Sequence, residues 1–293
     1  MALIPFDDRD GHIWMDGKLI PWREAQVHVL THGLHYGSSI FEGQRVYNRK
    51  VFKLEQHTSR LFESARIMGF QIPFTEAQIN DACKQVVEAA GLDDAYMRPV
   101  AWRGSEQMAV SAQQSKIHVA IAVWPWPSMF DPEVKARGIK LDIARWRRPA
   151  PDTTPWKAKA AGLYMICTLS KHEAEAKGLA DAMMYDWRGL VAEATGANIF
   201  FVKDNKLFTP YADCFLNGIT RQTVMDLARN RQIEVVEKYI QSSDVGSYEQ
   251  CFLTGSAAEV SPVGQIGDWK FEVGNITRTL MDDYSNFVRG KKV

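Results

Sequence analysis

Apolar and polar residues alternate in short runs along much of the chain, and several of these runs meet at residues that favour tight turns. Asp16-Gly17 separates two such apolar runs, which indicates a β-hairpin with a left-handed turn residue. Further strand pairs are predicted to turn at Asn48-Arg49, Trp187-Arg188-Gly189 and Asp204-Asn205. The chain is therefore expected to contain several antiparallel pairs.

Other segments carry apolar residues at helical spacing. Leu61, Ala65 and Met68 share one face of a predicted helix over about 55–68, and Gly69 follows it as glycines do at helix ends. The same reasoning predicts helices over 76–90, 162–177, 219–229 and 277–288. Single strands are expected over 117–127, 139–148 and 233–240, and a strand with a tight turn over 250–263.

The order of these elements suggests two domains. Prolines gather in 124–138, where they would interrupt both strands and helices, so this stretch contains the candidate linker. We expect an N-terminal domain at 1–125, a linker at 126–138 and a C-terminal domain at 139–293. Each half mixes antiparallel strands with helices, which predicts two α/β or α+β domains. A length of 293 residues is consistent with that number.

Composition narrows the class of partner. Lys+Arg and Asp+Glu both number 35, so no net charge favours nucleic acid or a membrane surface, and small molecules are the expected partners. The four cysteines form no C-x-x-C pair, which fits a reducing cytoplasm. The first residues lack the features of a secretory signal, and no apolar run approaches the ~18 residues of a membrane span.

Several catalytic classes are disfavoured. The chain has no G-x-S-x-G, H-E-x-x-H or G-x-x-x-x-G-K-[ST] sequence. His28, His32 and His35 have a spacing that could serve a metal, but no nearby cysteine or acidic residue except Glu24 completes a ligand set. No metal site is predicted.

Two lysines in the stretch PWKAKAAGLYM, residues 155–165, are candidates for chemistry. In an extended segment Lys157 and Lys159 would share a face, whereas in a helix they would lie about 200° apart. A lysine at a helix start faces the positive end of the dipole, which favours the free amine that a Schiff base requires. The pattern does not distinguish such a lysine from one on the surface.

Three other features could bind charged groups. NGIT, residues 217–220, places a glycine before a predicted helix, where free amides can hold an anion. TGSAAE, residues 254–259, is a small-residue turn with a hydroxyl and exposed amides. Glu193 lies in an apolar, strand-like context where a carboxylate needs a partner such as a protonated ring nitrogen. Taken singly, each feature also fits a structural role.

Taken in order, these stretches resemble the signatures of the fold-type IV pyridoxal-phosphate enzymes. The motifs are PDTTPWKAKAAGLY, LVAEATGANIFFVKDNKLFTP, LNGITRQTV and FLTGSAAEVSPV. Two N-terminal stretches, HGLHYGSSIFEGQRVY and AYMRP, are similar to those of the branched-chain amino-acid aminotransferases in that group. The likeness runs from about residue 10 to residue 290. It implies a small N-terminal and a larger C-terminal domain with the active site between them, and a homodimer or higher oligomer.

The resemblance also implies roles for residues around pyridoxal 5'-phosphate. Lys159, five residues before Tyr164, would be the Schiff-base lysine that binds the cofactor and carries the proton, and Lys157 lacks that spacing. Glu193 would pair with the pyridine nitrogen and Tyr164 with the phenolate oxygen. The phosphate would be held by Arg60, by the amides of Ile219 and Thr220 and by the hydroxyl of Ser256. Leu216 would pack on the ring.

The substrate residues implied by the resemblance line an apolar wall or bind carboxylates. Arg98 would serve the distal carboxylate of glutamate, and the turn at Ala257 and Ala258 the α-carboxylate. The other expected pocket residues are Tyr36, Phe41, Tyr96 and Trp126. The chain departs from many relatives at Ala161, Leu163 and Ser256, none of which removes a cofactor contact.

The implied reaction is transamination between the L-amino acids leucine, isoleucine or valine and 2-oxoglutarate, giving branched 2-oxo acids and L-glutamate. Enzymes of the same fold that act on D-amino acids or (R)-amines, and aminodeoxychorismate lyases, share the cofactor residues and remain alternatives. FEGQR and YMRP favour the L-branched-chain class. Outside the family, the alternative is a non-catalytic two-domain binding protein, which would be colourless.

Overall fold

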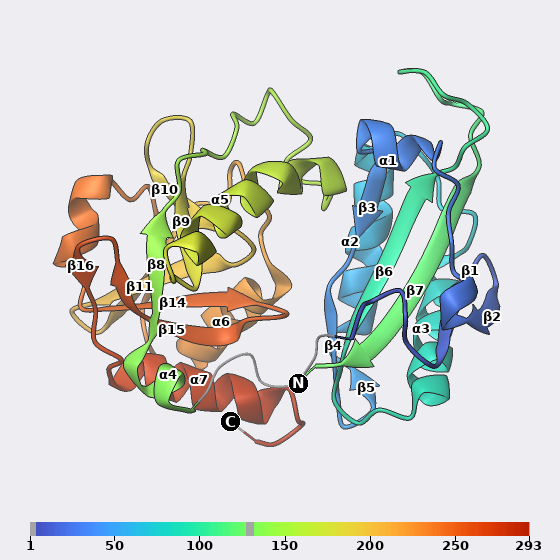
Figure 1. Cartoon of the computed structure of the whole chain (residues 1–293). Coiled ribbons are helices and arrows are strands. Elements are labelled where there is room, and N and C mark those ends of the chain that lie inside the picture. Colours follow the sequence, from blue (N-terminus) through green and yellow to red (C-terminus); the bar gives the residue numbers. More distant parts are fainter. Residues whose placement is uncertain (1–3, 127–131, 293) are drawn as a thin grey trace. The chain divides into compact units, whose positions relative to one another are not determined.

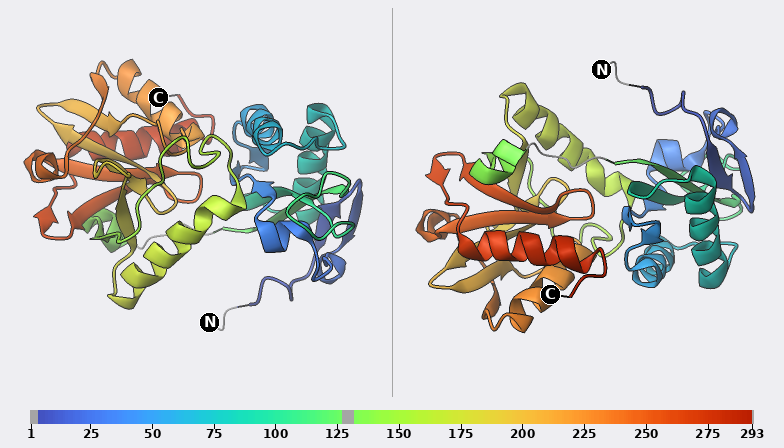
Figure 2. Two further views of the ribbon diagram at one scale, coloured as in Figure 1. Left: turned by 90° about the horizontal axis from the view of Figure 1, so that it is seen from above. Right: turned by 90° about the horizontal axis from the view of Figure 1, so that it is seen from below.

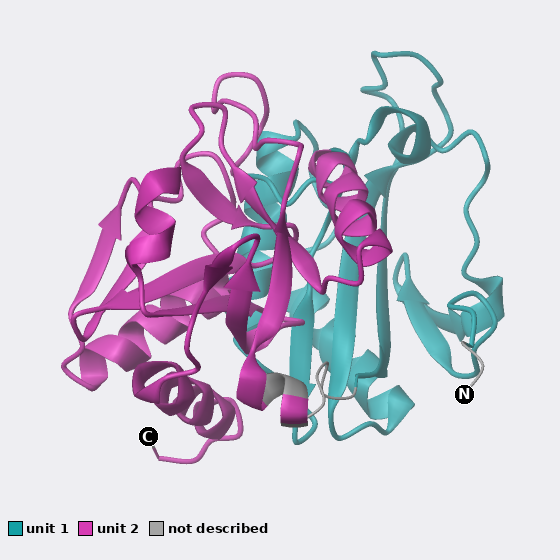
Figure 3. Cartoon of the chain, turned by 60° about the vertical axis from the view of Figure 1, so that its left-hand side comes forward, with its two compact units in different colours: residues 1–127, 158–162 teal, residues 128–157, 163–293 magenta. Residues whose placement is uncertain are grey.

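The computed structural model describes residues 4–126 and 132–292, except the side chains of Pro132, Val134 and Lys135. It divides into two compact units (Figure 3). The N-terminal unit comprises residues 1–127 and Ala158–Gly162, and the C-terminal unit comprises 128–157 and Leu163–Val293. Of the expected linker at 126–138, residues 127–131 lie outside the described residues, and a short helix, α4 (Pro132–Arg137), follows them. The linker and domain boundaries remain a prediction.

The segment that carries Lys159 groups with the N-terminal unit, whereas the sequence placed that lysine in the C-terminal domain. The reason is local pairing. Ile40 forms an isolated antiparallel bridge with Ala160, and the Phe41 amide donates to the Lys159 carbonyl at 3.1 Å. A second bond, from the Lys159 amide to Ser64 Oγ at 3.0 Å, ties the same segment to a helix.

The N-terminal unit is built on an antiparallel seven-stranded sheet (Figure 1). The strand order is β2-β1-β7-β6-β4-β5, and β3 also pairs with β6. The strands are β1 (His12–Met15), β2 (Lys18–Pro21), β3 (Ser39–Phe41), β4 (Gln44–Tyr47), β5 (Lys50–Val51), β6 (Ala95–Arg103) and β7 (Ile117–Pro125).

Strand β6 was not expected from the sequence, and it contains a proline at position 99. Proline is tolerated there because β3 pairs with β6 only as far as Phe41 with Val100, and β4 begins pairing at Gln44 with Met97. Pro99 therefore faces the break between β3 and β4 and loses no ladder bond. The Glu42 amide in this break donates to the Pro99 carbonyl at 2.8 Å, which places Glu42 inside the unit.

Two helices cover this sheet (Figure 1) and bury apolar residues against it. Helix α2 (Leu54–Ile67) contacts β3, and α3 (Glu76–Ala90) packs against α2, β1 and β7. Thr75 and Gln78 form a capping box at the start of α3. The short segments α1 (His32–Tyr36) and η1 (Trp22–Glu24) complete the unit.

The C-terminal unit is built on a nine-stranded mixed sheet. Its order is β10-β9-β8-β15-β14-β11-β12-β13, and β16 pairs with β15. The strands are β8 (Ile139–Ile143), β9 (Asp181–Tyr185), β10 (Val191–Ala194), β11 (Asn198–Lys203), β12 (Lys206–Pro210), β13 (Val235–Lys238), β14 (Gln250–Gly255), β15 (Glu259–Ile266) and β16 (Trp269–Lys270). Three pairs are parallel: β8 with β9, β8 with β15, and β12 with β13.

Helices of the C-terminal unit pack on this sheet (Figure 2). Helices α6 (Ile219–Asn230) and α7 (Asn275–Phe287) contact each other and β14, and α5 (Met165–Ala176) packs on β9. The connections include η2 (Ala161–Tyr164) and η3 (Ser242–Ser247). None of the described helices is long and apolar enough to cross a membrane.

Most of the predicted elements are confirmed. Asp16, Asn48, Arg49, Asp204 and Asn205 all have positive φ, as the predicted hairpin turns require. The helices predicted over 55–68, 76–90, 219–229 and 277–288 correspond to α2, α3, α6 and α7.

Two predictions were wrong in extent. The helix expected from residue 162 begins only at Met165, because residues 161–164 form the tighter η2 turn. The strand expected over 139–148 ends at Ile143.

Candidate functional site

Lys159 lies in an irregular segment next to an aromatic ring of its own unit. Its Nζ is 4.9 Å from the centre of the Phe41 ring, and its main chain is held on both sides by the bonds to Phe41 and Ser64. The flanking residues Ala158 and Ala160 are buried, whereas Lys159 is half-buried. Lys157, in the other unit, is exposed, and its Nζ lies 5.3 Å from the Trp156 ring. Residues 157–159 belong to neither a helix nor a strand, so the helical alternative for the lysine pair does not apply.

A buried ionic network in the N-terminal unit holds the predicted phosphate residue Arg60. Arg60 Nε donates to Glu42 Oε1 at 2.7 Å, and Arg60 Nη2 donates to Glu42 Oε2 at 2.8 Å. His57 Nδ1 lies 2.7 Å from the same Oε2. The side chain of Glu42 is fully buried and that of Arg60 is 17% exposed. This bidentate geometry fixes the plane of the guanidinium group.

The network shifts the pKa values of its members. Burial alone would raise the pKa of Glu42, but the charge and hydrogen bonds of Arg60, with the bond from His57, bring it well below its ordinary value. Burial lowers the pKa of His57, the bond to Glu42 offsets part of this, and the charges of Arg60 and Lys159 lower it further. Glu42 is therefore an ionised acceptor, so the neutral His57 ring donates from Nδ1.

Several of the predicted substrate residues lie together in the N-terminal unit. The Arg98 guanidinium is 4.6 Å from the centre of the Phe41 ring, and its Nη2 donates to the Tyr96 hydroxyl at 3.1 Å. The Tyr96 ring lies 4.9 Å from that of Trp126. Tyr36 is not part of this group, because its ring stacks on His32 and is 47% exposed.

Glu193 lies on β10 of the C-terminal unit and is buried. Its Oε1 is 3.2 Å from Arg148 Nε, and its Oε2 accepts a bond from Asn198 Nδ2 at 3.2 Å. Arg148 also donates from Nη1 to Cys167 Sγ at 3.2 Å. The guanidinium of Arg148 offsets part of the free-energy cost of burying the Glu193 carboxylate. The apolar sequence around Glu193 indicated that such a partner would be needed.

Helix α6 begins beside the same glutamate. Asn198 Nδ2 donates to the Leu216 carbonyl at 3.0 Å, and the Gly218 amide donates to Asn198 Oδ1 at 3.2 Å. Gly218 is the N-cap residue, and no side chain caps the helix. Ile219 and Thr220 begin α6, so their amides have no acceptor within the helix. Glu193, Leu216, Ile219 and Thr220 are thus brought together through one asparagine.

Ser256, Ala257 and Ala258 form the turn between β14 and β15. The preceding Thr254 is buried, and its hydroxyl has no hydrogen-bond partner among the described residues. Gly255 lies against the backbone of Gly196 and Ala197. A pocket of about 430 Å³ in this unit is lined by Ala257 and Ala258, by residues 195–197 and by Tyr164.

Tyr164 ends the η2 turn and packs beside an apolar cluster of the C-terminal unit that includes Cys167 and Met184. Burial raises the pKa of the Cys167 thiol to about 11, partly offset by the Arg148 charge. The Cys167 thiol beside Arg148 is therefore protonated at neutral pH.

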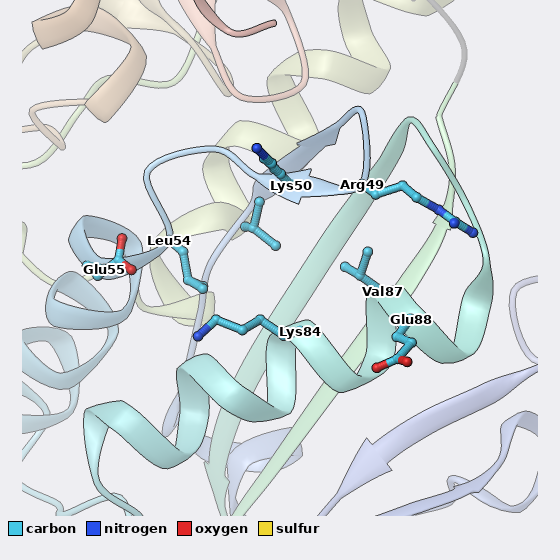
Figure 4. A pocket seen from close by; sticks show the side chains of 8 residues that line it. Arg49, Lys50, Leu54, Glu55, Lys84, Val87 and Glu88 are labelled. Carbon is cyan, nitrogen blue, oxygen red and sulfur yellow. The ribbon is translucent and has the colours of Figure 1, made fainter. Parts of the chain in front are cut away.

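Three further polar groups lie among the described residues. His28, His32 and His35 each bond to nearby backbone or hydroxyl groups. Among the described residues, one group of three possible metal ligands has its ligand atoms within 4.8 Å of one another: Asp186, Asp213 and Cys214. Arg188 pairs with both carboxylates of this group. A pocket of about 490 Å³ between β5 and the helices α2 and α3 mixes three cations with two carboxylates (Figure 4), and contains none of the predicted residues.

Comparison with known proteins identifies the family of this chain. The family model for amino-transferase class IV matches residues 39–266. The chain belongs to the class IV aminotransferase family. A relative in Rickettsia conorii, named as a probable branched-chain-amino-acid aminotransferase, is 41% identical and aligns with 99% of this chain and 100% of its own.

Solved structures of the family agree with this fold. The T.th. branched-chain amino acid aminotransferase with pyridoxamine 5'-phosphate matches with a TM-score of 0.94 and 34% identity, covering 97% of this chain and 96% of that one. The same enzyme complexed with N-(5'-phosphopyridoxyl)-L-glutamate matches with a TM-score of 0.92, with the same identity and coverage. The two-domain α/β fold expected from the sequence is confirmed.

Four polar residues of this class IV aminotransferase were missed by the sequence reasoning. They are Glu42, His57, Arg148 and Asn198. A signal existed for two of them. Glu42 is a lone carboxylate directly after the apolar residues Ile40 and Phe41, as Glu193 is after LVA, and Asn198 directly follows the stretch TGA. His57 and Arg148 stand among other charged residues, and nothing in the pattern distinguishes them.

Proposed function

We propose that this protein is a pyridoxal-phosphate-dependent aminotransferase that exchanges amino groups between L-branched-chain amino acids and 2-oxoglutarate. The products would be branched 2-oxo acids and L-glutamate. The proposal rests on one arrangement in the C-terminal unit. A buried carboxylate, Glu193, is joined by one asparagine to the start of α6, which no side chain caps. A phosphorylated pyridinium needs an acceptor at its ring nitrogen and donors at its phosphate.

The residues of this set fit the cofactor. Arg148 next to Glu193 favours its ionised form, which can accept the ring N–H. The amides of Ile219 and Thr220 and the hydroxyl of Ser256 would bind the phosphate, and Leu216 would pack on the ring. The buried Thr254 hydroxyl is a further donor without a partner among the described residues. Tyr164 would donate to the phenolate oxygen.

The residues of the N-terminal unit would contribute the other groups. Arg60, with its plane set by Glu42, would bind the phosphate, and Lys159 would hold the cofactor covalently through Nζ. When bound, pyridoxal phosphate supplies an electron sink that stabilises negative charge at the substrate Cα. Lys159 Nζ, once released, would take the α-proton and return it to the cofactor, so one amine serves as anchor and as general base.

Substrate binding would use the aromatic side chains around Arg98 and the turn between β14 and β15. Phe41, Tyr96 and Trp126 would form the apolar wall for a branched side chain, without Tyr36, whose ring stacks on His32 instead. The turn at Ala257 and Ala258 would bind the α-carboxylate. Arg98, held by the Tyr96 hydroxyl and the Phe41 ring, would bind the distal carboxylate of glutamate.

The decisive test compares donors. Purified protein should be yellow and should transfer the amino group of L-leucine to 2-oxoglutarate, measured as glutamate formed, but not that of D-alanine. Activity with the D-donor alone would assign the protein to the D-amino-acid branch of the fold. A colourless protein that binds no pyridoxal phosphate would contradict the proposal altogether.

Arg98 offers a more specific prediction. An Arg98→Met variant should keep the packing on Phe41 but lose the charge for the distal carboxylate. We expect the KM for 2-oxoglutarate to rise on the order of 10- to 100-fold, as for the loss of one charge-assisted bond, while the KM for L-leucine changes little. Equal effects on both KM values would remove Arg98 from this role.

We also propose that the protein works in the cytoplasm as a homodimer or a higher oligomer. Its four cysteines are all free and buried, which suits a reducing compartment. Large apolar side chains of the N-terminal unit are exposed over one stretch and a loop: Val27, Val29, Leu30, Leu34, Met108 and Val110. Such exposure is typical of a surface covered by another subunit. Light scattering that gives a monomer mass would contradict this.

A further inference from the structure

The side chain of Asn198 makes three hydrogen bonds, one to β10 and two to the loop that leads into α6. Its Nδ2 donates to Glu193 Oε2 at 3.2 Å and to the Leu216 carbonyl at 3.0 Å, and its Oδ1 accepts from the Gly218 amide at 3.2 Å. The residue is 5% exposed. Both amide hydrogens and the oxygen are therefore in use, which leaves the side chain one orientation.

The backbone of Asn198 is equally well fixed. Asn198 is the first residue of β11, an internal strand of the nine-stranded sheet, and pairs there with Thr254 of β14. A central strand moves little compared with the loop that carries Leu216 and the start of α6. Asn198 is thus a rigid reference point for the two groups that it binds.

The contact with Gly218 leaves no room for a side chain. A Cβ at Gly218 would lie 2.3 Å from Asn198 Oδ1, and the next nearest atoms would be at ordinary contact distances of 3.5 and 3.6 Å. Among the described residues, the only atom that would clash with a Cβ at Gly218 is therefore the side-chain oxygen of Asn198. The glycine that the sequence placed before the helix is required by Asn198.

We propose that Asn198 is a positioning residue that sets the spacing between Glu193 and the first amides of α6, and so holds the two ends of one cofactor molecule in register. This inference rests on the proposed function, in which Glu193 meets the ring nitrogen and α6 meets the phosphate. A ligand held at two points gains from the second contact only if the spacing of the two protein groups matches its own. Asn198 bonds to Glu193 itself and to Gly218, the N-cap residue directly before the amides of Ile219 and Thr220.

The test measures how much the phosphate adds to binding. Apoprotein is titrated with pyridoxal phosphate and with pyridoxal, and the ratio of the two dissociation constants gives the phosphate advantage. In Asn198→Ala we expect this advantage to fall on the order of 10- to 100-fold, by analogy with the loss of a group that orients the ligands of a metal ion. Asn80→Ala, which removes an amide bonded to Thr58 in the N-terminal unit, is the matched control and should keep the wild-type ratio.

Gly218→Ala provides a second route that retains the asparagine. The added methyl group should displace Asn198 and lower the phosphate advantage. Because the 2.3 Å contact disappears when Asn198 is alanine, the double variant should be no worse than Asn198→Ala alone. If Asn198→Ala does not fold, as judged by thermal unfolding, Gly218→Ala carries the test by itself.

The outcomes separate this inference from the function on which it rests. Wild-type protein that binds no pyridoxal phosphate would overturn the proposed function. Wild-type protein that binds it, with an unchanged phosphate advantage in folded Asn198→Ala or in Gly218→Ala, would overturn the role of Asn198 and leave the function standing. Strictly additive losses in the double variant would also contradict that role.

Discussion

A Lys159→Ala variant is expected to lose transaminase activity by on the order of 10⁴- to 10⁶-fold, as enzymes do when a residue essential to covalent catalysis is removed. The proposed function assigns two tasks to this one amine, covalent attachment of the cofactor and transfer of the α-proton. The bonds that hold the segment come from the backbone of Lys159, so alanine should preserve the local structure. Initial rates with L-leucine and 2-oxoglutarate measure the loss.

Lys157→Ala is the matched control because it removes an exposed lysine two positions away. Its activity should stay within a few-fold of the wild type. Borohydride reduction of the yellow protein should label a peptide at Lys159. A label on Lys157, or a Lys159→Ala protein that works at the wild-type rate, would refute the assignment made from the spacing to Tyr164.

Local signals in the sequence were sufficient for most helices and hairpins. Helix α3 occurs over the predicted range because Thr75 and Gln78 cap its start and Gly91, with a φ of 63°, ends it. The hairpin turns were predictable because they need positive φ, which asparagine, aspartate and glycine tolerate. In both cases a few adjacent residues determine the structure.

Contacts between distant segments were not predictable in this way. Strand β6 contains a proline and was missed, because only the break between β3 and β4 makes Pro99 acceptable. The same break buries Glu42, whose partners come from a helix that begins at residue 54. Asn198 likewise meets residues 18 and 20 positions away. Short motifs identified the candidate Lys159 and Glu193 but not the residues that hold the site in place.

A Glu42→Gln variant is expected to lose about 3–5 kcal/mol of the free energy of unfolding, the usual cost of removing one partner from a buried ion pair. Glutamine has the same shape but takes away the charge that Arg60 pairs with at 2.7 and 2.8 Å. The change also frees the Arg60 plane, so the affinity of the apoprotein for pyridoxal phosphate should fall. Urea unfolding of apoprotein at pH 7.5 measures the stability.

The control for this variant is Glu63→Gln on α2, the helix that also carries Arg60. Glu63 accepts two bonds from Arg66 in a similar geometry, but both side chains are largely exposed, at 49% and 73%. Solvent screens such a pair, so its loss should leave stability and cofactor affinity close to those of the wild type. Equal losses in the two variants would show that burial of Glu42 adds nothing.

The same network predicts how stability depends on pH. The pKa values of Glu42 and His57 are both lowered in the folded state, so the unfolded chain binds more protons, and stability must fall as the pH falls. For His57 the loss begins below about 6.5, and for Glu42 below about 4.3, the ordinary values of the two groups. His57→Asn should remove the first part of this slope and Glu42→Gln the second, in urea unfolding between pH 7.5 and 3.5. A wild-type stability that stays level over that range would contradict the buried, ionised state of Glu42 from which the orientation of Arg60 follows.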